Sequence, residues 1–92
     1  MIFKPKTKEE LRKAIEEYYE NDNQKNGNIN NWDVSLITDM SKIFICCKEF
    51  NQPINNWNVS NVTDMSYMFY GCEKFNQPLN NWNVSNVTNM SS

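Results

Sequence analysis

The residues with the most obvious chemistry are three cysteines, Cys46, Cys47 and Cys72. Cys47 and Cys72 occupy equivalent positions of adjacent sequence repeats, which could bring them within disulfide range. An odd number of thiols and an opening segment without a secretory signal favour free thiols in a reducing compartment. Because a buried free Cys behaves as a small apolar residue, we expect Cys47 and Cys72 to be structural and Cys46 to face outward.

Metal and acid–base chemistry find little support. Carboxylates at Asp33, Asp39 and Asp64 could collect a calcium ion. The equivalent positions of other repeats hold the amides Asn58, Asn83 and Asn89, which breaks up any dense acidic site. Helix capping explains Asp39 and Asp64 better. The cysteines cannot complete a tetrahedral zinc site, since the chain has no His. No nucleophile–base pair, phosphate-binding loop or pair of catalytic carboxylates can be assembled. The sequence therefore predicts a protein that is not an enzyme and has no cofactor or metal.

The chain repeats itself with a fixed period, which the even spacing of its three Trp residues marks. Residues 50–66 and 75–91 differ at only two positions, and residues 29–41 are a more divergent copy. Such a period is typical of stacked repeats in which each coil covers the apolar face of its neighbour. Stacked Trp side chains can bind sugars or bases, but their alternation with polar residues favours a place in the core. The columns expected from stacking include Trp32/Trp57/Trp82, Phe44/Phe69, Phe50/Phe75 and the charged pair Glu49/Lys74.

Local patterns predict which elements position these residues. Thr7 and Glu10 form a capping box for an amphipathic helix over residues 8–20. Alternation of apolar and polar residues predicts a strand over residues 54–59. Apolar spacing predicts one or two helical turns from residue 63, ending at Gly71.

Together these elements predict an α/β fold, a leucine-rich-repeat-like solenoid with a short parallel sheet on one side, short helices on the other and an N-terminal capping helix. We expect residues 1–24 to form the capping helix and its loop, and residues 25–92 to form about two and a half repeats (25–49, 50–74 and 75–92). The third repeat lacks counterparts of Phe69 and Cys72. We therefore expect its coil to expose apolar surface and unpaired backbone groups.

The pattern Val62-Thr63-x-Met65-Ser66-x-x-Phe69-x-x-Cys72-x-x-Phe75, with the recurring Trp-Asn-Val-Ser, resembles the BspA-like leucine-rich-repeat surface proteins. The branch in question is that of mycoplasma surface lipoproteins, also common in protists and large DNA viruses. The resemblance covers nearly the whole chain. It implies a right-handed solenoid, protein binding or adhesion at a cell surface, and no enzymatic activity.

Two hypotheses for function follow. In the first, the protein is a non-catalytic scaffold that binds proteins or surface ligands through outward residues of the strand side: Asn56, Asn58, Asn81 and Asn83. In the second, it is a structural or assembly module, such as a viral one, that self-associates through an uncapped C-terminal coil. A net charge of −2 argues against nucleic acid, and no apolar run is long enough to span a membrane. Without a signal the expected location is cytoplasmic or virion-associated, whereas the resemblance implies the cell surface.

Overall fold

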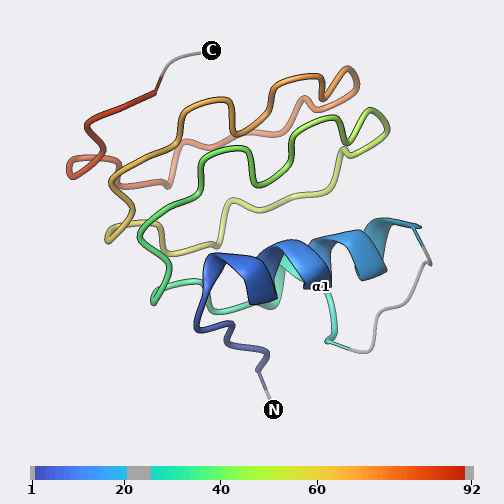
Figure 1. Ribbon diagram of the computed structural model, residues 1–92, viewed down its shortest axis with the longest axis horizontal. Helices are drawn as coiled ribbons and strands as arrows, with labels where there is room; N and C mark the ends of the chain where they lie inside the picture. The colour runs from blue at the N-terminus through green and yellow to red at the C-terminus, as the bar shows by residue number, and fades with distance from the viewer. Residues whose placement is uncertain (1, 21–25, 91–92) are drawn as a thin grey trace.

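The computed structural model describes residues 2–20 and 26–90, and it contains the helix α1 (Lys8–Glu20) and the 3-10 helix η1 (Ile29–Asn31) (Figure 1). The prediction of a helix over residues 8–20 is confirmed. Its first turn is held as the capping box predicts, because the Glu10 N–H donates to Thr7 Oγ1 over 3.1 Å. The part of the predicted loop at residues 21–25 and the last two residues lie outside the described residues.

Helix α1 packs its apolar face against the first repeat. Leu11, Ala14 and Ile15 are buried in the common core. Two polar contacts fasten the helix: Arg12 Nη1 donates to the Ile43 carbonyl over 2.6 Å, and the Tyr19 hydroxyl accepts from the Glu49 N–H over 2.7 Å. α1 therefore covers one end of the stacked coils, below them in Figure 1.

The predicted leucine-rich-repeat-like α/β solenoid with a parallel sheet is wrong. The described residues hold no sheet, and their only parallel pairing is a pair of isolated bridges, Asp39 to Asp64 and Asp64 to Asn89. Neither the strand predicted at residues 54–59 nor the helical turns predicted from residue 63 form. Each repeat is instead one coil of turns and extended segments. We call residues 26–49, 50–74 and 75–90 the first, second and third coils (Figure 1).

Tight turns replace the predicted strand. The Trp57 N–H donates to the Ile54 carbonyl over 3.1 Å, and the Val62 N–H donates to the Val59 carbonyl over 3.0 Å. The Asn55–Asn56 pair occupies the middle of the first turn, a position that Asn favours. The alternation of apolar and polar residues therefore reports which side chains face the core, and not a strand.

Backbone hydrogen bonds of two alternating kinds replace the predicted helix. In the first coil, the N–H groups of Lys42, Phe44 and Cys46 donate to carbonyls of the second coil over 2.8–3.0 Å. The N–H groups between them donate three residues back within the coil, as Ile43 does to Met40. An α-helix would direct every N–H four residues back, so this alternation excludes it. Lys42 and Cys46 accommodate the pattern with φ of +61° and +62°.

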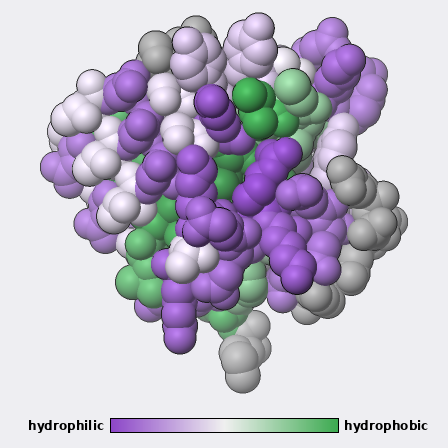
Figure 2. Space-filling model, viewed as in Figure 1, coloured by the Kyte–Doolittle hydropathy of each residue, from purple (hydrophilic) through white to green (hydrophobic). Residues whose placement is uncertain are grey.

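The predicted register between repeats is confirmed by contacts between coils. The Phe44 and Phe69 rings stack with centroids 5.5 Å apart and planes 5° apart, and Phe50 stacks on Phe75 in the same way. Lys74 Nζ lies 3.4 Å from Glu49 Oε2, as the charged column predicts. The buried apolar side chains form one core inside the coils. The face of the molecule shown in Figure 2 is largely polar.

Candidate functional site

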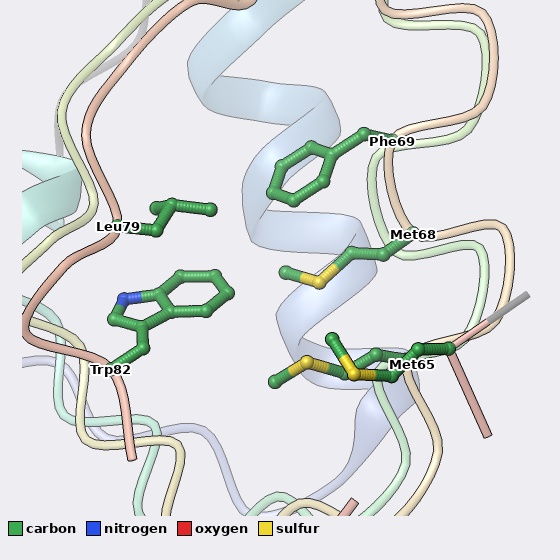
Figure 3. Close-up of a pocket in the computed structure, with 6 residues that line it drawn as sticks. Met65, Met68, Phe69, Leu79 and Trp82 are labelled. Atoms are coloured by element: carbon green, nitrogen blue, oxygen red, sulfur yellow. The ribbon is translucent and has the colours of Figure 1, made fainter. Parts of the chain in front are cut away.

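An apolar pocket opens where the second coil faces away from the first. Its volume is about 280 Å³. One wall carries Met65, Met68 and Phe69 from the second coil, and the facing wall carries Leu79 and Trp82 from the third (Figure 3). Met90 completes the lining. The pocket is therefore built from the columns that form the core in the earlier coils.

The columns become more exposed from coil to coil. Met40 is fully buried, Met65 is 6% exposed, and Met90 is 59% exposed. Likewise Trp57 is buried whereas Trp82 is only half-buried. The reason is geometric, because each coil is covered on one side by the next coil, and no described residue covers the third.

Hydrogen bonding to the coil beneath fixes the orientation of the pocket's largest side chain. Trp82 Nε1 donates to the Ile54 carbonyl over 3.0 Å, as Trp57 Nε1 does to the Ile29 carbonyl over 2.7 Å. The indole N–H is thereby satisfied inside the protein, and the ring presents its carbon surface to the pocket. Such a rigid aromatic wall suits an apolar ligand.

The four predicted site residues Asn56, Asn58, Asn81 and Asn83 are all exposed. Two of them build local turns: Asn58 Oδ1 accepts from the Ser60 N–H over 3.1 Å, and Asn83 Oδ1 accepts from the Ser85 N–H over 3.1 Å. Their amide oxygens are therefore already engaged, as is typical of Asn in turns.

The structure brings two of these four residues into one groove. Asn56 and Asn58 help to line a shallow polar groove of about 420 Å³, whereas Asn81 and Asn83 do not. Asp33 contributes the groove's negative charge. The pKa of Asp33 is lowered by hydrogen bonds from Ser35, with a smaller contribution from Lys4, whose Nζ lies 3.7 Å away.

The aspartates considered for calcium act as turn caps. Asp39 Oδ1 accepts from the Ser41 N–H over 2.8 Å, and Asp64 Oδ1 accepts from the Ser66 N–H over 2.9 Å. Desolvation raises the pKa of Asp39, but the hydrogen bonds from Ser41 and the charge of Lys8 outweigh it, so the net shift is downward. Within residues 2–20 and 26–90, no three Cys, Asp or Glu side chains are grouped so as to hold a metal ion.

The three thiols are free and differ in exposure. Cys46 is exposed, as predicted, Cys47 is buried, and Cys72 is half-buried. Cys72 Sγ donates to the Phe44 carbonyl over 2.9 Å. Burial, together with the neighbouring Cys47, raises the pKa of Cys72 to about 11. Burial also raises the pKa of Cys47, although the Arg12 guanidinium beside it acts in the opposite direction.

These environments predict selective thiol labelling. At about pH 8 iodoacetamide should modify the exposed Cys46 quickly and the other two thiols slowly, because those two are more covered and their pKa values are raised. Mass spectrometry of the folded protein should show a single fast adduct, which Cys46→Ser should abolish. Equal rates for Cys46 and Cys72 would contradict the assignment.

Sequence reasoning placed the pocket residues in core columns and not in a site. The available signal was the two aromatic columns Trp32/Trp57/Trp82 and Phe44/Phe69. The last members of both columns, Phe69 and Trp82, line the pocket. What the sequence did not indicate is that this surface forms a concave pocket with two facing walls.

Comparisons with known proteins give one match. The family model described as "Mycoplasma protein of unknown function, DUF285" matches residues 13–92, which is most of the chain. No curated protein and no solved structure matches the chain. Among the described residues, no helix has the length and apolar character needed to cross a membrane.

Proposed function

Given that this chain belongs to the DUF285 family, whose description assigns no activity, we propose that it is a non-catalytic protein-binding module that binds through the apolar pocket at its third coil. The family is related to the BspA-like group that the sequence resembles. Association with a cell surface is part of the same proposal and rests on that resemblance alone. The observation that carries the proposal is the pocket itself, with its facing aromatic and methionine walls (Figure 3).

The size and lining of the pocket favour a protein partner over a small molecule. Pockets for drug-sized ligands occupy roughly 300–1,000 Å³, and this one, at about 280 Å³, lies just below that range. It can instead accept one or two large side chains, as binding hot spots do. Met65, Met68 and Met90 add flexible, polarisable surface that adapts to an apolar anchor.

The polar groove is the second candidate surface. Asn56 and Asn58 are exposed there and could donate through their amide nitrogens. However, Asn58 Oδ1 already accepts from Ser60 N and Oγ, over 3.1 and 2.7 Å. Less hydrogen-bonding capacity is therefore left for a ligand, and we place the groove second.

Selection from a random peptide library tests the proposal without a known partner. Peptides selected on the immobilised protein should carry aromatic or aliphatic anchors and should bind the Met90→Glu variant at least about tenfold more weakly, because a carboxylate would then be buried against the anchor. Met90 is 59% exposed, so this change should leave the fold intact.

The matched control uses the predicted polar face. Asn81→Ala changes an exposed residue outside the pocket and should leave the affinity of the selected peptides unchanged. Peptides that lose affinity with Asn81→Ala and not with Met90→Glu would overturn the choice of surface. A library that yields no specific binder would overturn the proposed function.

A further inference from the structure

We propose that Cys47 and Cys72 form an oxidation site, at which a low-molecular-weight disulfide joins the two thiols and so links the first coil covalently to the second. This inference is independent of the proposed function and of the apolar pocket. It is drawn from the hydrogen bonds that hold the two coils together on both sides of these thiols.

Backbone hydrogen bonds between the coils bracket the two cysteines of the proposed site. Just before them, the Cys46 N–H donates to the Tyr70 carbonyl over 2.8 Å. Just after them, the Lys74 N–H donates to the Lys48 carbonyl over 3.2 Å. The two cysteines lie between these bonds, so they occupy facing positions of two paired chain segments.

The backbones of the two coils are in close contact here. Cys46 Cα lies 3.3 Å from the position that a Cβ on Gly71 would occupy. Paired chain segments lie roughly 4.8 Å apart, and a disulfide joins Cα atoms that are usually about 4.4–6.8 Å apart. The facing positions of Cys47 and Cys72 therefore meet the main geometric condition for a disulfide.

Both cysteines already converge on one backbone group. The Phe44 carbonyl accepts from the Cys47 N–H over 3.1 Å and from the Cys72 thiol over 2.9 Å. Cys72 Sγ therefore lies beside the backbone of Cys47 and leans toward the first coil.

The Cys47 side chain can turn toward Cys72 at little cost. Its sulfur has a long contact with Arg12 Nη1, at 3.9 Å, whereas the same nitrogen donates to the Ile43 carbonyl over 2.6 Å. Rotation of the Cys47 side chain away from Arg12 would bring the two sulfur atoms together. The stronger hydrogen bond of Arg12 would remain in place.

The third thiol, Cys46, does not fit either alternative pairing. Cys46 and Cys47 are consecutive, and the separation of about 3.8 Å between consecutive Cα atoms is below the usual range for a disulfide. Cys46 is exposed and its Sγ lies 3.6 Å from the Cβ position at Gly71, whereas Cys72 is half-buried and directed at the Phe44 carbonyl. The pair that the fold brings together is therefore Cys47 and Cys72.

Exchange with oxidised glutathione gives a balanced route to this bond. The Cys72 thiolate, the more exposed of the pair, attacks one sulfur of the glutathione disulfide, and one glutathione leaves as a thiolate that takes up the proton lost by Cys72. The Cys47 thiolate then attacks Cys72 Sγ, and the second glutathione leaves and takes up the proton lost by Cys47. Two protein thiols are oxidised, and one glutathione disulfide is reduced to two thiols.

Burial slows the exchange in both directions. It raises the pKa of Cys47 and of Cys72, so little thiolate is present near neutral pH and oxidation is slow there. The same raised pKa makes each sulfur a poor leaving group when a reductant attacks the disulfide. Once formed, the bond should therefore persist longer than an exposed one.

The test treats folded protein carrying Cys46→Ser with oxidised glutathione at about pH 9, where more thiolate is present. The Cys46→Ser background is used because the exposed Cys46 would itself take up glutathione. The intact mass should fall by two hydrogen atoms, with no glutathione attached. Digestion with trypsin, which cleaves after Lys, should release residues 43–48 and 49–74 as one linked species.

Two further variants identify the pair and its effect. Cys47→Ala, which retains Cys46 and Cys72, should stay folded by circular dichroism and should not link the two fragments. Oxidation should raise the unfolding temperature of Cys46→Ser by at least about 10 °C, because the bond closes a loop of one repeat in the unfolded chain. Cys72→Ala should show no such rise, and a reductant should reverse the rise in Cys46→Ser.

Three results would overturn the inference. They are glutathione adducts of Cys46→Ser that never give way to the cross-link, a cross-link of equal yield in Cys47→Ala, and an oxidised protein that unfolds at a lower temperature than the reduced one. The last result would show that the facing positions cannot hold the bond without strain.

Discussion

Replacing Trp57 by Ala is expected to lower the free energy of unfolding by about 3–5 kcal/mol, as truncation of a buried aromatic residue does. For so short a chain this is a large part of the stability of the fold, since small domains are stabilised by only about 5–15 kcal/mol. We expect circular dichroism to show the variant largely unfolded at about 37 °C.

The large effect is expected because Trp57, a residue of the second coil, also packs against and hydrogen-bonds to the first coil. Its side chain is 2% exposed, and its ring lies 5.7 Å from that of Phe44. Its indole N–H satisfies the buried Ile29 carbonyl of the first coil over 2.7 Å. Ala would therefore leave a cavity between the coils and would remove one of the two hydrogen bonds that the Ile29 carbonyl accepts, the other coming from the Trp32 N–H over 3.2 Å.

Trp82 provides the matched control. It occupies the equivalent position in the next coil and makes the equivalent bond to Ile54, but it is half-buried. Trp82→Ala should therefore cost clearly less than Trp57→Ala in urea denaturation followed by circular dichroism. Equal losses, or a Trp57→Ala variant with near wild-type stability, would show that the middle coil is not the centre of the core.

Features encoded within a few residues could be predicted from the sequence. The start of α1 follows from Thr7 and Glu10, and the structure places the helix over residues 8–20 as predicted. The register between coils could also be predicted, because Phe44 and Phe69 can stack only if the period of the sequence is also the spatial period.

The predicted strand and helix were wrong because the hydrogen bonds that determine the backbone conformation join different coils. The Phe44 N–H donates to the Met68 carbonyl of the second coil and not to a carbonyl of its own coil. The spacing of apolar residues in the sequence would be the same for either hydrogen bond, so it could not distinguish a helix from this coil. The positive φ of Tyr67 is equally hidden, since a Gly would announce such a backbone and a Tyr does not.

In the candidate site, too, some features could be predicted from the sequence and others depend on contacts between coils. The sequence predicted that Asn58 and Asn83 face outward, and they do, but their amide oxygens cap turns. The apolar residues of the pocket were predicted as core columns, and they do continue the core. Their exposure depends on which coil covers which, and for Met90 no local pattern within its own repeat could reveal it.

The backbone origin of the coil is tested most sharply at Lys42. Its side chain is exposed, its φ is +61°, and its N–H donates to the Ser66 carbonyl of the second coil over 3.0 Å. Lys42→Pro removes this donor and requires φ near −65°, so we expect a loss of stability on the order of 3 kcal/mol in urea denaturation.

Lys42→Gly is the matched control, because it removes the same exposed side chain but keeps the N–H and tolerates the positive φ. Its stability should remain within about 1 kcal/mol of wild type, since relief of backbone strain offsets the greater entropy of the unfolded chain. If Lys42→Pro and Lys42→Gly both lowered stability only slightly, the backbone hydrogen bonds between coils could not be what stabilises this conformation in place of a helix. If only Pro is damaging, the loss must arise from the backbone, because the two variants lack the same lysine side chain and differ in what the main chain can do.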